Sequence, residues 1–323
     1  MKILVTGGCG FIGSHFIKET LRQNEDWEII NLDKLTYAGR KENLVEIENN
    51  PHYTFMKGDI CDPMVVEKAM RGVDAVINFA AESHVDRSIQ DARAFIRTDV
   101  EGAFTLLDAA RKNEVKKFVQ ISTDEVYGQI MSGSFTEESL LNPRNPYSAS
   151  KAGADRLAYS FHSTYGMDVC ITRSSNNYGT HQYPEKLIPL FITHLIQEKK
   201  VPVYGEGKNI RDWLHVKDNC AALLGVLEKG KSGEVYNIGG GNERTNMEIT
   251  RSILAEMGKG DEMITYVEDR KGHDWRYSLD SRKIEHELGW RPRVPFEQGL
   301  RETIRWYAQN EKWWKPLVER PIK

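Results

Sequence analysis

The chain has 323 residues, of which 40% are hydrophobic and 10% aromatic, enough to build the core of one large α/β domain or of two domains. Its 44 basic and 47 acidic residues give a formal charge of −3, and no block of Lys and Arg suits a phosphate backbone. We therefore expect no nucleic-acid partner.

The cysteines and the hydropathy pattern indicate the compartment. Cys9, Cys61, Cys170 and Cys220 are scattered with no C-x-x-C spacing. This distribution argues against zinc and against a disulfide scaffold, so we expect reduced thiols and no metal. No apolar run approaches the roughly 18 residues that a membrane span needs. We expect a cytoplasmic protein with no membrane partner.

The first predicted element is a short strand over residues 3–5. Gly7, Gly10 and Gly13 follow it in a G-x-x-G-x-x-G spacing, and a helical pattern over residues 16–21 comes next. Such a loop turns tightly and brings the free amides of a helix N-terminus against a pyrophosphate. The spacing alone is a weak signal, but the order of strand, loop and helix predicts a dinucleotide site.

A second predicted strand, residues 28–33, ends in Asp33, and that acid follows Gly13 at the distance typical of a ribose-binding residue. An acid at this place binds the ribose hydroxyls of NAD and repels the 2′-phosphate of NADP. Arg40 lies nearby in the sequence and could bind a 2′-phosphate, so NADP stays a minor alternative. A simple turn cap is the other interpretation of Asp33.

Two further predicted strands end in residues that suit a cofactor crevice. The strand over residues 53–57 leads to Asp59 and Ile60, which would contact an adenine, although a helix N-cap is an almost equal interpretation of Asp59. The strand over residues 75–79 leads to Ala80-Ala81, whose small side chains allow a cofactor to lie close.

A helical pattern over residues 91–113 precedes the segment that carries the candidate chemistry. The apolar run at residues 118–121 predicts a buried parallel strand whose carboxyl end delivers Ser122, Thr123, Asp124 and Glu125 to a crevice. An Asp-Glu dipeptide most often lies in a solvated turn. This one is a candidate for the site because it comes directly after a buried strand.

Pro146 opens a helical pattern in which Tyr147 and Lys151 stand four residues apart on one face. Such pairs are common on half-exposed helices, so the spacing alone carries little weight. Together with two carboxylates and a dinucleotide loop, it predicts an active site. We expect the Lys151 cation to make the Tyr147 phenol ionise more easily.

The alternation of strands and helices predicts an α/β fold with a doubly wound parallel (Rossmann) sheet. After the predicted strand at residues 169–174 the pattern becomes less regular and richer in proline. We predict an NAD-binding domain over residues 1–177, rejoined by about 212–240, and a smaller, mainly C-terminal substrate domain over residues 178–323.

Seven sequence blocks spread over most of the chain carry a family resemblance. They are TGGCGFIG (6–13), DKLTYAG (33–39), AAESHVDRS (80–88), STDEVYG (122–128), SNNYG (175–179), PEKLIPL (184–190) and DRKGHD (269–274). These blocks resemble the extended short-chain dehydrogenase/reductase superfamily and, within its sugar-nucleotide branch, the dTDP-glucose 4,6-dehydratases. Lys271 stands where that family pattern leads us to expect a proline.

The resemblance implies conversion of dTDP-glucose to dTDP-4-keto-6-deoxyglucose and water with NAD as cofactor. Tyr147 would take the proton of the sugar 4-OH, which Thr123 hydrogen-bonds, while a hydride leaves C4. Glu125 would then act as base at C5 and Asp124 as acid at the departing 6-OH, before the hydride returns to C6. Such products enter deoxysugar biosynthesis, for example of rhamnose.

Two alternatives stay open within the superfamily. A 4-epimerase shares the Tyr147 and Lys151 pair but needs no acid to expel water, and it typically has small residues in place of Asp124 and Glu125. Dehydratases that act on other nucleotide sugars tend to place a lysine after the aspartate, so Glu125 favours the dTDP-glucose branch.

The resemblance also assigns binding residues and an assembly. For NAD they are Gly7, Gly10, Phe11, Ile12, Gly13, Asp33, Lys34, Thr36, Asp59, Ile60, Ala80, Ala81, Thr98, Tyr147, Lys151 and Asn177. For the nucleotide sugar they are Ser83, Thr123, Asn176, Glu185, Lys186, Leu187, Pro202, Tyr204, Arg211, Asn246, Arg270 and His273. A homodimer through the helices near 91–113 and 147–165 is expected.

Two residues of the sugar-nucleotide set also have simpler interpretations. Arg211 is the strongest candidate because its fork can hold phosphate oxygens, although a surface ion pair with Asp212 or Glu206 is the alternative. His273 on its own would more often be structural.

Overall fold

The computed structural model describes residues 1–270 and 272–319. Lys271, the one departure from the family pattern noted above, lies outside the described residues.

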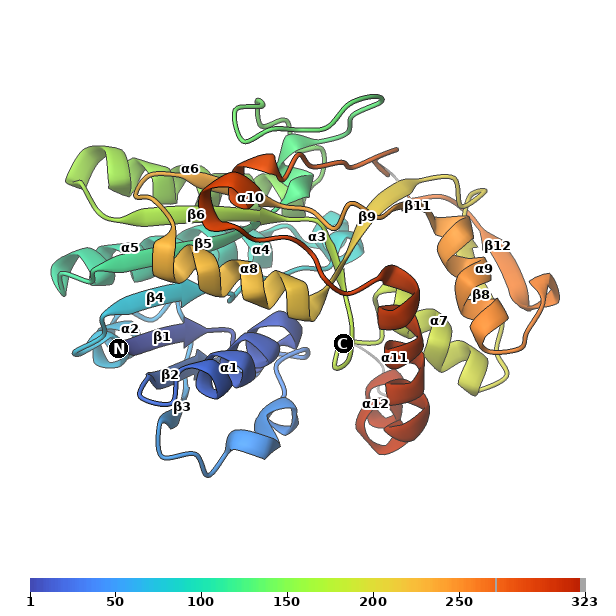
Figure 1. Cartoon of the computed structure of the whole chain (residues 1–323), viewed down its shortest axis with the longest axis horizontal. Helices are drawn as coiled ribbons and strands as arrows, with labels where there is room; N and C mark the ends of the chain where they lie inside the picture. The colour runs from blue at the N-terminus through green and yellow to red at the C-terminus, as the bar shows by residue number, and fades with distance from the viewer. Residues whose placement is uncertain (271, 320–323) are drawn as a thin grey trace.

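A fully parallel sheet of seven strands forms the centre of the molecule (Figure 1). In spatial order its strands are β10 (Val235–Ile238), β6 (Val169–Ser174), β5 (Lys117–Thr123), β4 (Ala75–Asn78), β1 (Lys2–Thr6), β2 (Glu28–Asp33) and β3 (Tyr53–Lys57). The strand order reverses between β1 and β4, which creates a crevice at the carboxyl ends of these strands. The predicted doubly wound sheet is confirmed.

Helices cover both faces of this sheet (Figure 1). Helices α1 (Phe11–Gln23) and α8 (Val216–Lys229) pack on one face, and α2 (Pro63–Met70), α5 (Gly102–Lys112) and α6 (Pro146–Tyr165) pack on the other. Ile3 and Val5 of β1 join the first core and Leu4 joins the second. Because both faces are buried, the strands are continuous apolar runs.

A smaller body follows β6. It holds a sheet of β11 (Glu243–Thr245), β9 (Ile210–His215) and β7 (Asn176–Tyr178), a pair of β12 (Ile264–Val267) and β8 (Val201–Tyr204), and the helices α7 (Leu187–Ile196), α9 (Asn246–Glu256), α11 (Phe296–Gln309) and α12 (Glu311–Val318). Its own core includes Phe191, Ile253 and Trp314. Strand β10 belongs to the large sheet although it lies beyond residue 178, and the domain boundary itself stays a proposal.

The region expected to be helical over residues 91–113 is divided. Helix α4 (Arg93–Phe95) leads into a π-helical segment, η2 (Ile96–Glu101), and then into α5. π-Helical turns are frequent at functional sites because they redirect side chains. Here the turn contains Thr98, which reaches the central cavity, and the buried Asp99.

The remaining elements are short. They are η1 (Lys41–Ile47), α3 (Val85–Gln90), η3 (Asp124–Tyr127), η4 (Asp261–Met263) and α10 (Arg282–Leu288). Across the described residues, no helix is long and apolar enough to cross a membrane.

Candidate active site

A cavity of about 330 Å³ lies at the carboxyl ends of the central strands, where the strand order reverses. All five predicted catalytic residues and all sixteen predicted cofactor residues line it. The cavity is thus formed by segments far apart in the chain, from the glycine loop to the residues after β7. This is the place where open parallel sheets bind ligands.

The glycine loop between β1 and α1 forms one end of the cavity. A Cβ on Gly7, whose φ is +66°, would lie 2.7 Å from the backbone nitrogen of Ala80, and a Cβ on Gly13 would lie 2.6 Å from the Gly7 carbonyl oxygen. Only glycine fits either place. Helix α1 begins at Gly10 without a side-chain cap, which leaves its first amides free to bind an anion.

Asp33 lies at the end of β2 and is buried beside this loop. Its carboxylate accepts hydrogen bonds from the backbone nitrogens of Cys9 at 2.8 Å and Leu35 at 2.7 Å. Burial raises the pKa of Asp33 above its ordinary value. The turn-cap interpretation describes the contact to Leu35, but Asp33 also fixes the glycine loop and lines the cavity.

Two charged residues near the glycine loop, Arg40 and Asp59, form ion pairs. Arg40 pairs with Glu42 at 3.2 Å and lies over the Trp313 ring, and it does not line the cavity. Asp59 lines the cavity and pairs with Lys34 at 2.7 Å. The N-cap interpretation of Asp59 is wrong, since Asp62 caps α2 in its place.

The end of β5 carries the predicted acid and base. The Thr123 hydroxyl donates to the Asp124 carboxylate at 3.1 Å and accepts from the Glu125 backbone nitrogen at 3.3 Å. Burial, and next the charge of Glu125, raise the pKa of Asp124 to about 8. Asp124 is therefore protonated at neutral pH, as a general acid must be.

Helix α6 presents Tyr147 and Lys151 to the same point. Asn145 caps it, with Pro146 in the first turn, which fixes where the helix starts relative to β5. The Asn145 side chain also donates to the Glu125 carboxylate at 3.3 Å. The cap thus joins the helix carrying the phenol to the turn carrying the carboxylates.

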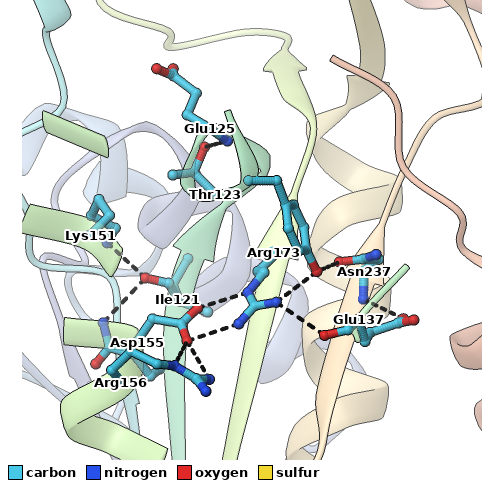
Figure 2. A network of polar contacts seen from close by, with 11 residues as sticks. Ile121, Thr123, Glu125, Glu137, Lys151, Asp155, Arg156, Arg173 and Asn237 are labelled. Carbon is cyan, nitrogen blue, oxygen red and sulfur yellow. Dashed lines mark hydrogen bonds and ion pairs between the residues drawn. The ribbon is translucent and has the colours of Figure 1, made fainter. Parts of the chain in front are cut away.

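The expected effect of Lys151 on Tyr147 is wrong for the protein without ligands. Burial, the negative charges of Glu125 and Asp99 and, more weakly, that of Asp124 raise the pKa of the Tyr147 phenol, and only a hydrogen bond with Thr123 acts in the opposite direction. The Lys151 ammonium points instead at the carbonyl oxygen of Ile121, 2.7 Å away (Figure 2). Helical spacing predicted the shared face but not this competing acceptor.

Buried polar side chains that the sequence analysis missed hold Lys151 in place. The Ile121 carbonyl also accepts from Gln120, whose amide oxygen accepts from Asn78, and Asn78 in turn accepts from Thr6. The three side chains lie at the ends of three neighbouring strands and are almost fully buried. They connect the strand before the glycine loop with the catalytic helix.

A buried ion pair fixes α6 one turn after Lys151 (Figure 2). Arg173 of β6 donates to both oxygens of Asp155 at 2.8 and 2.9 Å, in a bidentate arrangement. Arg173 also donates to the Tyr127 hydroxyl at 2.7 Å, which itself donates to Asn237 of β10. Removing Asp155 would leave the buried Arg173 guanidinium without its ion partner, whereas Asp155 also pairs with Arg156 at 2.8 Å.

The predicted sugar-nucleotide residues divide into two groups. Ser83, Thr123, Asn176, Glu185 and Lys186 line the cavity. The cavity lining does not include Leu187, Pro202, Tyr204, Arg211, Asn246, Arg270 and His273. These seven residues belong to the smaller body and lie away from the cofactor end of the cavity.

Arg211 is buried and its partners differ from the expected ones. Its guanidinium donates to the backbone carbonyls of Ile210 at 2.7 Å and Asp274 at 2.9 Å and stacks on the Tyr277 ring at 4.2 Å. Asp212 instead accepts from two backbone nitrogens near β11. The alternative of a surface ion pair is wrong.

Three of the outer residues form a cluster beside Lys186. Tyr204 lies 6.0 Å from the Arg270 guanidinium and 6.3 Å from the His273 ring, and His273 contacts Asp269 at 2.6 Å. The charge of Arg270 helps to lower the pKa of Lys186, after burial. Two cations that repel each other and a tyrosine suit a nucleotide diphosphate better than a neutral ligand.

The sequence analysis missed several cavity residues that flank the predicted ones. They are Leu32, Ala38, Gly39, Gly58, Phe79, Glu82, Ile121, Ser174, Ser175, His181, Gln182 and Tyr183. Buried oxygens of Ser175 and Gln182, like those of the predicted Ser122, Asn176 and Asn177, have no hydrogen-bond partner among the described residues. Buried polar atoms require partners, so these oxygens mark ligand-binding positions. Their position in or shortly after the carboxyl-terminal parts of β5, β6 and β7 is the signal that could have identified them.

No group of three or more potential metal ligands occurs among the described residues. The cavity brings together the glycine loop, the carboxyl groups of Asp124 and Glu125, and the Tyr147 phenol. That combination defines an extended short-chain dehydrogenase/reductase.

Comparisons with known proteins narrow this class. The family model described as GDP-mannose 4,6 dehydratase matches residues 4–303. A dTDP-glucose 4,6-dehydratase of Streptomyces niveus is 53% identical over 321 residues, covering 98% of this chain and 96% of the relative. The low-salt glycan biosynthesis protein Agl12 of Haloferax volcanii is 50% identical over 312 residues, covering 97% and 100%.

Solved structures agree with these relatives. The dTDP-glucose 4,6-dehydratase DesIV of Streptomyces venezuelae, solved with NAD bound, is 52% identical with a TM-score of 0.97, covering 98% of this chain and all of that one. A UDP-glucose 4-epimerase of Thermotoga maritima, solved with UDP-glucose, is 30% identical with a TM-score of 0.89, covering 96% and 100%. The chain belongs to the dTDP-glucose 4,6-dehydratase family, and the predicted resemblance is confirmed.

Proposed function

We propose that this protein converts dTDP-glucose to dTDP-4-keto-6-deoxyglucose and water. The observation that carries the proposal is the meeting of a protonated Asp124, Glu125 and the Tyr147 phenol in one cavity with a dinucleotide loop. A dehydratase needs an acid and a base in addition to the groups that oxidise the sugar. The relatives named above support the same substrate.

The residues present suit NAD. Gly7 and Gly13 allow the close backbone packing of the loop, which any side chain would disrupt and which brings the first amides of α1 to the cavity, and Asp33 lies where a ribose diol would be held. The only nearby arginine considered for a 2′-phosphate, Arg40, is already paired and outside the cavity. Bound NAD would supply the hydride acceptor at sugar C4 and the hydride donor at C6.

The residues of the chain then carry the proton transfers. Thr123 would hold the sugar 4-OH while Tyr147 takes its proton, and Lys151 stands behind the phenol on the same helix face. Oxidation at C4 acidifies the C5 hydrogen, so Glu125 removes it as Asp124 protonates the 6-OH, which leaves as water. Glu125 returns a proton to C5 after hydride return.

Tyr147 requires help to ionise because its own surroundings raise the pKa of the phenol. The positive nicotinamide of NAD is the charge that this site would gain on loading, and it acts in the direction that favours phenolate. Proton transfer from the sugar is therefore expected only in the loaded protein.

The wider assignments are proposals as well. We place the nucleotide diphosphate beside Lys186, Arg270 and the other outer residues, with Arg211 positioning the segment at Asp274. We also propose a cytoplasmic enzyme of deoxysugar biosynthesis, such as that of rhamnose. A homodimer through α5 and α6 is supported by their exposed aromatic side chains, among them Phe104 and Tyr165.

Purified protein incubated with dTDP-glucose tests the function directly. We expect a 4-keto-6-deoxy product without added cofactor, and NAD rather than NADP on denaturation. In heavy water, deuterium should appear at C5, while the hydrogen first on C4 ends on C6. Solvent deuterium at C6 in place of that hydride would overturn the mechanism.

The 4-epimerase alternative makes a different prediction for the same sample. It would interconvert UDP-glucose and UDP-galactose and leave dTDP-glucose unchanged. A panel of dTDP-, UDP-, CDP- and GDP-sugars separates it, and other dehydratases, from the proposed activity.

A further inference from the structure

Three segments around the cavity are joined by one buried contact that the proposed chemistry does not use. Tyr37 lies in the loop after β2, Arg87 lies in α3, and Glu185 lies in the segment between β7 and α7. The Tyr37 hydroxyl donates to one oxygen of Glu185 at 2.7 Å, and Arg87 donates to the other at 3.1 Å. We call these three residues the clasp.

The clasp is tightly packed. The Arg87 guanidinium lies 3.6 Å from the centre of the Tyr37 ring, and Tyr183 meets the same ring edge-on at 5.1 Å. The Glu185 side chain is only 9% exposed. Charge-assisted hydrogen bonds and a cation over an aromatic face are both strengthened when water is excluded.

Each segment that the clasp joins forms part of the cavity wall. The loop of Tyr37 contributes Thr36, Ala38 and Gly39, the approach to α3 contributes Glu82 and Ser83, and the segment after β7 contributes His181 to Lys186, with Pro184 excepted. A second link runs parallel to the clasp, because the Lys186 ammonium donates to the Ser83 carbonyl at 2.6 Å. Separation of these walls would widen the cavity on the side that the three segments form.

Separating the walls would break the Tyr37 hydrogen bond and the Arg87 ion pair together. Glu185 would then lose both of its hydrogen-bond partners in the clasp at once; His84, at 3.9 Å, and Lys186 are further cations near its carboxylate. The burial of this contact makes that loss costly. The clasp therefore resists opening far more than the surface ion pairs elsewhere in the chain do.

We propose that Tyr37, Arg87 and Glu185 hold the cofactor in its cavity from one turnover to the next. The inference rests on the proposed function, in which NAD is reduced and reoxidised within each cycle and has no need to exchange. Tyr37 and Arg87 are positioning residues, since neither lines the cavity. Glu185, assigned above to the nucleotide sugar, acts here through its two partners.

The test compares NAD release from two tyrosine variants. Tyr37→Phe keeps the ring under Arg87 but removes the hydroxyl, and Tyr266→Phe alters a tyrosine that is 61% exposed in β12. Each NAD-loaded protein is mixed with excess isotope-labelled NAD, and exchange of bound cofactor is followed over time. We expect exchange at least ~10-fold faster in Tyr37→Phe than in wild type, the usual effect of losing one charge-assisted hydrogen bond, and unchanged in Tyr266→Phe.

Two further measurements separate retention from folding. Tyr37→Phe should remain folded and melt in one cooperative transition, as the wild-type protein does, while amide hydrogen exchange in residues 34–40 becomes faster. Glu185→Gln, which leaves an acceptor for Tyr37 but removes the ion pair with Arg87, should also release NAD faster than wild type.

The outcomes are distinguishable. Wild-type exchange rates in both Tyr37→Phe and Glu185→Gln would overturn the clasp and leave the proposed function intact. Wild-type protein that binds no NAD at all would overturn the proposed function, and this inference with it.

Discussion

At the scale of single residues, environment separates the roles of two adjacent carboxylates. Asp124 is buried and has its pKa raised to about 8, whereas Glu125 is less buried and accepts a hydrogen bond from Asn145. Carboxyl groups whose surroundings differ in this way suit one acid and one base at the same pH. The proposed elimination needs both.

Substitution of Glu125 and Tyr147 should separate two steps of the reaction. Glu125→Gln should still allow oxidation at C4, but elimination should fall by ~10²-fold or more, the usual contribution of a positioned base. Reduced nicotinamide would then accumulate and be seen by its absorbance. Tyr147→Phe should show no such signal, because the 4-OH proton has no acceptor. Equal signals from both variants would contradict the assignment.

The pH dependence should report Asp124. A raised pKa keeps this acid protonated below about pH 8, so kcat/KM should fall as pH rises through about 8. Asp124→Asn should lower kcat/KM by ~10²-fold or more and should lack this alkaline limb. Asp74→Asn, which changes a surface carboxylate paired with Lys116, should retain it. An alkaline limb that persists in Asp124→Asn would assign it to another group.

At the scale of elements, helix α6 is held at three points along its length. Asn145 caps its start, Lys151 bonds to the Ile121 carbonyl, and Asp155 pairs with Arg173 of β6 (Figure 2). These contacts tie the helix to β5 and β6, whose ends carry the rest of the site. The position of Tyr147 therefore depends on the whole element.

Removing the cap of α6 should affect both stability and turnover. Asn145→Ala should destabilise the protein by about 1 kcal/mol, as loss of an N-cap does. It should also lower kcat, since Glu125 loses its Asn145 partner. Asp62→Ala removes the N-cap of α2, away from the carboxylates, and is the matched control. Chemical denaturation and steady-state kinetics of both variants measure the difference; an equal loss of kcat in both would contradict a role for Asn145 at the site.

At the scale of the whole molecule, two bodies with separate cores meet at the cavity. The large sheet carries the glycine loop and the residues proposed for the chemistry, and the smaller body carries the outer cluster around Tyr204, Arg270 and His273. On the sheet face formed by α5 and α6, Phe104 is 49% and Tyr165 is 56% exposed. Exposed aromatic side chains on neighbouring helices are typical of an interface.

The proposed dimer should depend on this face. Light scattering of wild-type protein should give twice the mass of the chain. Phe104→Glu should shift the protein towards the single-chain mass, because a carboxylate would be buried without a partner. Tyr266→Glu alters an aromatic on β12 that is more exposed, at 61%, and should leave the mass unchanged. A wild-type protein with the mass of one chain would contradict the proposal.

Local patterns in the sequence determined the fold class and the inner half of the site. The glycine loop, Asp33, the Asp124-Glu125 pair and the spacing of Tyr147 and Lys151 each depend on a strand end or one helical turn, which short-range chemistry specifies. All of these residues line the one cavity. Their catalytic and binding roles remain predictions.

Only the tertiary structure decided which groups these residues meet. Lys151 points at Ile121 rather than setting the pKa of Tyr147, Arg211 bonds to the carbonyl of Asp274, 63 residues away, and Tyr37 meets Glu185 148 residues further along the chain. Spacing within one element cannot predict such partners. They depend on which loops the sheet order brings together, and burial there sets the strength of each contact and the direction of each pKa shift.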